Sequence, residues 1–466
     1  MIKQLLLTAS VVCLTGCTVG PDYNAPSQSF LDTWFSSDTK STPPDPISTQ
    51  WWSIFEDPLL EQYIAAAAEN NYDLKIALAN VRRVRALRKE QRGSLFPQIN
   101  SSNSTDRSQS TGAFSNFNGG EILDRHTLDF DASWEIDIFG GNRRSIEAAE
   151  ARIGESVAEY QDVMLSTLSE VARIYYEARG LQKRIAITEQ NTQLLKETFD
   201  VIQDRMEIGE TSDFDLARAQ GEYELTRARI PNLQAELRGY IYSLSVLLGQ
   251  PPEALLAEME AIKPLPTPPD IVPVGLRSDI LRRRPDIRIA ERALAASVAD
   301  IGVEKAELFP KFFLTGGLGS QAQFFGDLFT TSARVWSLGS AMQWTVFGGG
   351  TIHARIDAQD AESEAALAQY EKSVLEALQD AETALTRYGE ELETRKRLAQ
   401  AVLSRRKALT LAKELFNAGE EDYLAVVDTE RELIDSEDDL IISETTSITK
   451  LIALHTALGG GWEHFD

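Results

Sequence analysis

The chain has 466 residues and a formal net charge of −25. A surface this acidic excludes a nucleic-acid partner, because no excess of positive charge is available to neutralise phosphates. Beyond the N-terminus, no stretch has the roughly 20 consecutive apolar residues of a membrane helix, so a segment that crosses a bilayer must be a β-strand. The length alone would allow about three ordinary domains.

Residues 1–16 are predicted to be a secretory signal peptide. Lys3 precedes an apolar run, residues 5–14, that is too short to span a bilayer. The run ends at Leu14-Thr15-Gly16-Cys17, which has the small residues and the cysteine of a bacterial lipoprotein cleavage site. We expect cleavage before Cys17, a diacylglycerol on its thiol and a further acyl chain on its freed amine. Two or more acyl chains anchor a protein stably in a membrane.

The rest of the sequence is an internal duplication with an offset of about 210 residues. This period is far longer than that of a solenoid repeat. We therefore expect two halves, residues 57–262 and 278–460, joined by a proline-rich linker at 263–277. A lipidated extended segment, 17–56, precedes them and a tail, 461–466, follows. The duplicated motifs are Leu95-Phe96-Pro97 with Leu308-Phe309-Pro310, Phe139-Gly140-Gly141 with Phe347-Gly348-Gly349, Ile208-Gly209-Glu210 with Ala418-Gly419-Glu420, and Leu247-Leu248-Gly249 with Ala457-Leu458-Gly459.

Each half is expected to contain a helix, two strands, a long helix and a medium helix. Asp57 and Pro58 begin the first helix, because Asp caps free N–H groups and Pro suits the first helical position. The expected ranges are about 58–93, 96–138, 141–208 and 214–248 in the first half, and about 278–307, 309–347, 350–418 and 423–458 in the second. Each long helix would extend about 100 Å, and its apolar and small residues have coiled-coil spacing.

Residues 128–138 alternate strictly between apolar and polar side chains. This length and alternation are typical of a transmembrane strand, apolar towards lipid and polar towards a lumen. Four strands cannot close a barrel, and open edges are not tolerated in lipid. Two copies would give a barrel filled by side chains, and three a water-filled one. A soluble amphipathic sheet is the alternative for these strands, and a periplasmic lipoprotein scaffold built only from coiled coil is the alternative for the whole chain. The polar strand face, expected to line an acidic lumen, carries Asp129, Asp131, Glu135 and Asp137.

Three further segments carry a family resemblance. Residues 17–26, which begin Cys17-Thr18-Val19-Gly20, residues 51–60, which begin Trp51-Trp52, and Arg284-Pro285-Asp286 look like signatures of one group. On these segments the chain resembles the TolC-like outer membrane factors, in particular the lipoprotein (NodT/OprM-type) branch of efflux channels. The resemblance implies an α+β membrane protein. It also implies a homotrimer with a twelve-stranded transmembrane β-barrel, four strands per chain, continued by a long antiparallel α-helical barrel in the periplasm.

The resemblance also implies a function. The chain would be an exit duct, lipid-anchored in the bacterial outer membrane and extending into the periplasm, which passes substrates from an inner-membrane pump and a periplasmic adaptor. It implies no enzymatic activity, and no cofactor beyond the lipid on Cys17. The four histidines lack the spacing of metal ligands. Drug, metal and protein export remain open.

The resemblance places a gate in residues 423–431. Leu424 would form an apolar ring and Asp428 an acidic ring, and Arg431, one helical turn later, would hold the closed state. The Asp428–Arg431 pair could equally be an ordinary exposed ion pair. The turns after the long helices would lie at the periplasmic tip as adaptor-docking sites, although their glycines also serve as helix caps. These turns comprise Gly209, Glu210, Thr211 and Ser212, and Gly419, Glu420, Glu421 and Asp422.

Overall fold

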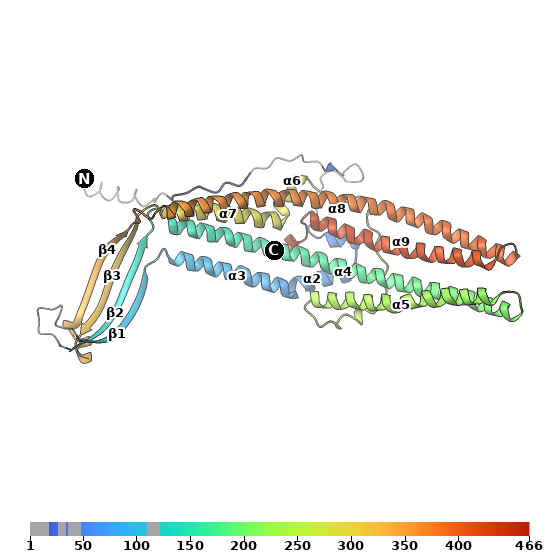
Figure 1. The fold of residues 1–466 in the computed structure, drawn as a ribbon, viewed down its shortest axis with the longest axis horizontal. Helices are drawn as coiled ribbons and strands as arrows, with labels where there is room; N and C mark the ends of the chain where they lie inside the picture. Colours follow the sequence, from blue (N-terminus) through green and yellow to red (C-terminus); the bar gives the residue numbers. More distant parts are fainter. Residues whose placement is uncertain (1–17, 27–33, 36–47, 110–121, 466) are drawn as a thin grey trace. The chain divides into compact units, whose positions relative to one another are not determined.

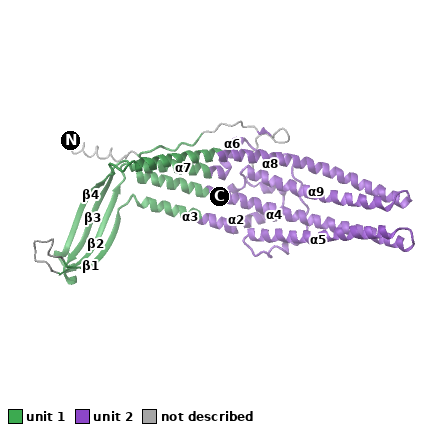
Figure 2. Cartoon of the chain, viewed as in Figure 1, with its two compact units in different colours: residues 1–27, 80–157, 289–371 green, residues 28–79, 158–288, 372–466 purple. Residues whose placement is uncertain are grey.

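The computed structural model describes residues 18–26, 34–35, 48–109 and 122–465 (Figure 1). The chain separates into two compact units, each assembled from segments that are far apart in the sequence (Figure 2). Unit 1 comprises residues 1–27, 80–157 and 289–371, and unit 2 comprises residues 28–79, 158–288 and 372–466. Each unit therefore draws on both halves of the duplicated sequence.

Unit 1 contains an antiparallel sheet in the order β1-β2-β3-β4 (Figure 1). The central pairing, of β2 with β3, joins the two halves of the sequence, with Trp134 opposite Leu314. Short helices η4 (Phe325–Phe329) and η5 (Thr331–Ala333) connect β3 to β4. The strands are β1 (Gln98–Gln109), β2 (Ile122–Ile136), β3 (Lys311–Ala322) and β4 (Arg334–Gln343).

The register gathers large apolar side chains on one face of this sheet. Phe130 of β2 lies opposite Leu318 of β3, which lies opposite Trp336 of β4. Their exposed fractions in the single chain are 50%, 64% and 79%. A contiguous apolar surface of this kind is unfavourable in water and marks an interface with lipid or protein. The alternation seen in the sequence thus becomes one apolar surface across three strands.

Two tryptophans fix the sheet at equivalent points of the two halves. The indole N–H of Trp134 donates to the carbonyl oxygen of Leu95, and that of Trp344 donates to the carbonyl oxygen of Leu308, both at 3.0 Å. Leu95 and Leu308 are the first residues of the duplicated Leu-Phe-Pro motifs. The sequence repeat is therefore also a repeat of contacts.

The order of helix, strand pair, long helix and medium helix occurs twice along the chain. Within the described residues, no helix combines the length and the apolar composition that crossing a bilayer would need. The helices are α2 (Pro58–Asn70), α3 (Tyr72–Gly93), α4 (Gly141–Glu207), α5 (Asp213–Leu247), α6 (Arg277–Arg283), α7 (Pro285–Ala306), α8 (Thr351–Ala418) and α9 (Tyr423–Ala457), with short helices η2 (Trp51–Phe55), η3 (Glu258–Glu260) and η6 (Trp462–His464).

The first helix of each half is divided, so the expectation of one continuous helix there is wrong. Between α2 and α3, the Asn71 side chain accepts from the amide of Asp73 at 2.8 Å and donates to the carbonyl oxygen of Leu247 at 2.9 Å. It therefore starts a new helix and ties it to α5. Between α6 and α7, Arg284 has an extended backbone (ψ 122°), as expected for a residue that precedes a proline.

An aromatic cluster forms a core of unit 2 where η2 packs against α4 and α9. Trp51 is buried and stacks on His455, with 5.6 Å between the ring centroids and 11° between the ring planes. The ring of Phe55 lies 4.9 Å from that of Tyr176. Neither ring nitrogen of His455 has a hydrogen-bond partner among the described residues, and burial lowers the pKa of this imidazole to about 4. The segment that begins with Trp51 is therefore a structural core element.

Candidate functional site

The long helices α4 and α8 both end at a glycine and reverse into a medium helix (Figure 1). Gly209 (φ 79°) and Gly419 (φ 74°) adopt the left-handed conformation that favours glycine. The amide after each glycine donates to the carbonyl oxygen five residues earlier, at 2.9 Å in the first turn and 3.0 Å in the second. These are the hydrogen bonds of a Schellman cap, so both predicted turns have one defined geometry.

Side-chain caps begin the medium helices on the other side of the two turns. The hydroxyl of Ser212 accepts from the amide of Asp215 at 3.2 Å, and the Asp215 carboxylate accepts from the amide of Ser212 at 3.3 Å. Hydrogen bonds from Ser212 and Thr211 hold the pKa of Asp215 below its usual range. In the second turn Asp422 accepts from the amide of Ala425 at 3.2 Å. These capping hydrogen bonds fix the backbone of both turns, and the polar groups that take no part in capping are held in defined positions.

Behind the turns, α4, α5, α8 and α9 share a hydrophobic cluster. On α9 it buries the face that carries Tyr423, Val426 and Val427. Leu424, Asp428 and Arg431 follow one another at intervals of four and three residues, which places them together on a separate face of the helix. The exposed fraction of Leu424 is 39%, and those of the Asp428 and Arg431 side chains are 43% and 52%. The predicted gate residues thus share one accessible face of α9.

Asp428 pairs with a residue that the motif did not suggest. Its Oδ1 accepts a hydrogen bond from Nη2 of Arg218 on α5 at 2.7 Å, whereas Nη2 of Arg431 lies 3.8 Å from the same oxygen. Arg218 precedes Asp428 by 210 residues, which is the offset of the internal repeat. The two residues therefore occupy equivalent positions in the two helical hairpins. We call Leu424, Asp428, Arg431 and Arg218 the tip cluster.

A buried carboxylate holds the opposite side of the same helix. Glu430 is 4% exposed and forms an ion pair with Lys413 of α8 at 2.7 Å. The hydroxyl of Thr198 on α4 donates to it at 3.4 Å. Removing the partner of a buried charge typically costs about 3–5 kcal/mol. Glu430 therefore fixes the rotation of α9 and, with it, the direction in which the Asp428 face points.

The acidic residues of β2 lie opposite β3. Asp129 is paired with Gly319, and Asp131 with Gly317, whereas Glu135 faces Phe313 in the register. A Cβ on Gly319 or Gly317 would come within 2.0 or 3.2 Å of the facing carboxylate oxygen. The glycines therefore leave the space that the two carboxylates occupy.

Asp137, expected on the same strand face, has a different role. It lies beyond the last residue of β2. Its carboxylate accepts from the amides of Asn142 and Arg143 at 3.3 and 3.0 Å, and it forms an ion pair with the Arg143 side chain. Negative charge at a helix N-terminus is stabilising. Asp137 therefore caps α4 instead of extending the acidic row of the strand.

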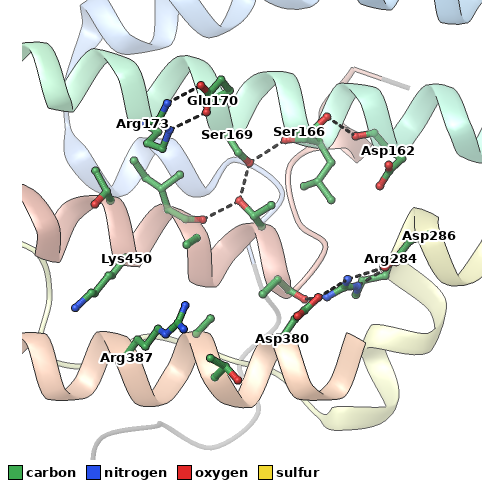
Figure 3. A pocket seen from close by; sticks show the side chains of 18 residues that line it. Asp162, Ser166, Ser169, Glu170, Arg173, Arg284, Asp286, Asp380, Arg387 and Lys450 are labelled. Carbon is green, nitrogen blue, oxygen red and sulfur yellow. Dashed lines mark hydrogen bonds and ion pairs between the residues drawn. The ribbon is translucent and has the colours of Figure 1, made fainter. Parts of the chain in front are cut away.

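Unit 2 also contains a cavity of about 670 Å³ between α4, α8 and α9 (Figure 3). Its charged lining residues are largely paired, including Arg173 with Glu170 and Arg284 with Asp286, both at 2.6 Å. Burial, together with the nearby Asp286, raises the pKa of Asp162. Charges of both signs alternate along the wall, so the cavity favours neither anions nor cations. Within the described residues, no group of three or more His, Cys, Asp or Glu side chains could hold a metal ion.

Comparison with known proteins places this architecture. The model of the family described as outer membrane efflux protein matches residues 63–250 and 276–460. The antibiotic efflux pump outer membrane protein ArpC of Pseudomonas putida is 30% identical, over 99% of this chain and 96% of that protein. Nodulation protein T of Rhizobium leguminosarum bv. trifolii is 28% identical, over 96% of this chain and 95% of that protein. The solved structure of the outer-membrane channel OprN has a TM-score of 0.90 and 34% identity, covering 96% of this chain and all of that chain.

These matches confirm the fold class, the exit-duct function and the outer-membrane location expected from the sequence. The two stretches matched by the family model contain the long and medium helices of both halves. The likeness to a solved channel extends over sheet and helices alike, which rules out the alternative of a scaffold built only from coiled coil. The chain belongs to the outer membrane efflux protein family and is an exit channel of the bacterial outer membrane.

Proposed function

We propose that the tip cluster gates the periplasmic end of a trimeric efflux duct formed by this chain. The four-stranded sheet has β1 and β4 at its edges, and open edges do not persist in lipid. Three copies supply about twelve strands, enough for a water-filled lumen. The duct works with a periplasmic adaptor and an inner-membrane pump, and the chain provides the passage without catalysis.

The observation that carries the gate is the hydrogen bond between Asp428 and Arg218. It joins the α8–α9 hairpin to the α4–α5 hairpin at the end where both helix pairs turn. Leu424 and Arg431 share the face of α9 that carries Asp428. Closing the hairpins around a three-fold axis would bring three such faces together, with an apolar ring at Leu424 and an acidic ring at Asp428.

The strength of this contact suits a gate that another protein opens. Both side chains are partly exposed, at 27% for Arg218 and 43% for Asp428. An ion pair with this exposure contributes about 1 kcal/mol or less. Three copies would therefore hold the closed state by about 3 kcal/mol, which the docking of an adaptor could readily offset.

The turns at Gly209–Ser212 and Gly419–Asp422 are the proposed docking sites for the adaptor. Apolar side chains flank the first turn: Ile208 is 70% exposed and Phe214 is 71% exposed. The second turn carries the acidic residues Glu420, Glu421 and Asp422. A partner with a small apolar tip and a basic rim would fit both turns.

Two further parts of the proposal concern the membrane end. Cys17, which lies outside the described residues, carries the lipid that anchors the mature chain, in keeping with its lipoprotein-type motif. Asp129, Asp131 and Glu135 line the lumen of the barrel, because they alternate with the apolar residues of β2. Residues 57–262 and 278–460 are the two duplicated halves, joined by 263–277.

Single-channel recording in planar bilayers tests the gate. Asp428→Ala and Arg218→Ala should each raise the conductance. A variant trimer loses about 1 kcal/mol in each chain and so about 3 kcal/mol in all, which shifts the closed-to-open ratio about 150-fold. Arg431→Ala should have a smaller effect, since Arg431 is the more distant partner. Arg229→Ala is the matched control, because this α5 arginine pairs with Asp435, at 3.5 Å and away from the tip cluster.

A charge exchange makes the test specific. The double variant Asp428→Arg with Arg218→Asp should return the conductance towards that of the wild type, because it rebuilds the pair in reverse. Wild-type conductance in both single alanine variants would refute the assignment of the gate to this contact.

A further inference from the structure

A buried arginine holds the segment that directly follows the proposed lipidation site. Arg144 of α4 has a side chain that is only 3% exposed. Its Nε donates to the carbonyl oxygen of Val19 at 3.1 Å, and its Nη2 donates to the carbonyl oxygen of Gly20 at 3.3 Å and to Asp22 Oδ1 at 2.7 Å. Glu147 accepts from Nη1 at 2.7 Å. One guanidinium thus binds three residues of the N-terminal segment.

Close backbone contact reinforces this grip. Gly20 has a φ of 96°, and a Cβ at this position would lie 2.5 Å from the Cα of Gly302 on α7. A Cβ on Gly302 would in turn lie 2.7 Å from the Arg144 side chain. There is therefore no space for an added methyl group between Gly20, Gly302 and Arg144. In packing this close, even a small increase in side-chain volume is destabilising.

The same segment is fastened to the link between β2 and α4. The amide of Val19 donates to the carbonyl oxygen of Phe139 at 3.1 Å. A Cβ on Gly140 would lie 2.9 Å from the Cα of Thr18. Further along, the Tyr23 hydroxyl donates to Glu291 of α7 at 3.1 Å. Thr18, the first residue of the segment, therefore lies against the chain that leaves the sheet.

We propose that Arg144, Gly302 and the Phe139–Gly140 link form a clamp that sets the depth at which the lipid anchor enters the outer membrane. Cys17 precedes Thr18 by one peptide bond, a Cα separation of about 3.8 Å. A lipid on Cys17 would therefore be attached one residue from Thr18, which contacts the chain that leaves β2. Trp134 lies two residues before the end of β2, and a tryptophan there suits the interfacial region of a bilayer.

The clamp explains what a lipid anchor adds to a chain whose strands already insert into the membrane. An acyl chain on a free tether would leave the anchor and the barrel unrelated in depth. With the tether held at its first residues, the lipid and the strand ends reach the same leaflet together. This inference rests on the proposed lipidation of Cys17, whereas the clamp itself rests on the contacts of Thr18 to Tyr23.

Hydrogen–deuterium exchange of the full-length trimer in lipid vesicles tests the clamp. In the wild type, the peptide that contains Val19 should exchange slowly. Arg144→Ala and Gly302→Ala should accelerate this exchange about tenfold or more, because they remove the hydrogen bonds or the fit that protect it. Arg144→Lys keeps the charge and loses the multiple hydrogen bonds, so it should give an intermediate rate. Arg152→Ala is the matched control, since Arg152 of α4 pairs with Asp300 of α7 at 2.5 Å but is 49% exposed.

Two readouts separate the clamp from the lipid. Unchanged exchange of the β2 peptide shows that a variant keeps its fold. Mass spectrometry of the N-terminal peptide reports acylation of Cys17 independently of exchange. An unacylated but slowly exchanging segment would overturn the lipid anchor and the role in setting its depth. An acylated segment that exchanges equally fast in the wild type and in Arg144→Ala would overturn the clamp.

Discussion

Acid should loosen the aromatic cluster of unit 2 through His455, and His455→Phe should abolish this effect. His455 stacks on Trp51, and neither of its ring nitrogens has a hydrogen-bond partner among the described residues. Burial lowers the pKa of the imidazole from 6.5 to about 4. Phenylalanine has a similar shape, keeps the stacking on Trp51 and cannot bind a proton.

The sign and size of the effect follow from the pKa difference between the folded and unfolded chain. Between pH 6.5 and pH 4 the unfolded chain binds a proton that the folded chain does not, so stability is complete above pH 6.5 and decreases as the pH falls. The full difference amounts to about 3 kcal/mol. At pH 5 about 2 kcal/mol should already be lost, which corresponds to an opening equilibrium about 30-fold larger.

Hydrogen–deuterium exchange of the peptide that contains η2 measures this opening. Rates at pH 7 and pH 5, corrected for intrinsic exchange, should differ about 30-fold more in the wild type than in His455→Phe. His464→Phe is the matched control, because His464 is exposed and contacts Trp52 in the same region. An equal pH response in the wild type and in His455→Phe would refute the reasoning, since the protonation of His455 would then not be coupled to opening.

Two further predictions concern packing and permeation. Gly180→Ala should destabilise the contact of α4 with α9 by about 1–3 kcal/mol, because its Cβ would lie 2.3 Å from Thr445 Oγ1. Thermal unfolding in detergent should show this loss of stability. Adding Thr445→Ala to Gly180→Ala should recover part of it, whereas Thr445→Ala alone should not stabilise the protein. Asp129→Asn with Asp131→Asn should reduce a cation preference of the open channel, measured as the reversal potential in a salt gradient. Anion preference in the wild type would contradict the acidic lumen.

Much of the fold could be predicted because its signals are local. Strict alternation depends only on neighbouring residues, and it predicted β2 together with its apolar face. Glycine caps act within one helical turn, and they placed the end of α4 within one residue and that of α8 at Ala418. The break before α7 also has a local signal, since Pro285 disfavours a helical Arg284.

Contacts between distant segments were harder to predict. The break at Asn71 depends on the carbonyl oxygen of Leu247, 176 residues away, and no local pattern indicates such a partner. Arg144 likewise binds Val19 and Gly20, which precede it by 125 and 124 residues, and no local pattern indicates these partners. Arg218 is the exception, because its repeat offset from Asp428 was available in the sequence. In two duplicated hairpins, equivalent positions lie at the same level along the helices. Opposite charges separated by the repeat offset therefore predict an ion pair between the hairpins.

The distribution of ion pairs predicts which helices would move in the proposed opening of the tip cluster. The buried carboxylate of Glu430 binds α9 to α8 through the partly exposed Lys413 at 2.7 Å. The contacts from α9 to the other hairpin are weaker near the tip, where Asp428 meets Arg218 in partly exposed surroundings and the hydroxyl of Thr198 lies 3.4 Å from Glu430. Farther along α9, Arg184 binds Asp438 through two hydrogen bonds at 2.8 and 2.9 Å.

A pair whose carboxylate is buried, as Glu430 is, resists separation more than a pair in which both groups are partly exposed, which contributes about 1 kcal/mol or less. Opening should therefore move α8 and α9 as one hairpin, breaking the Asp428–Arg218 contact and keeping the Glu430–Lys413 pair. The paired hydrogen bonds of Arg184 to Asp438 mark where this movement stops, because beyond them α9 is held to α4 more firmly than at the tip. In the proposed gate, the contact that breaks is thus the weakest one, and it lies near the turns where we propose that the adaptor docks.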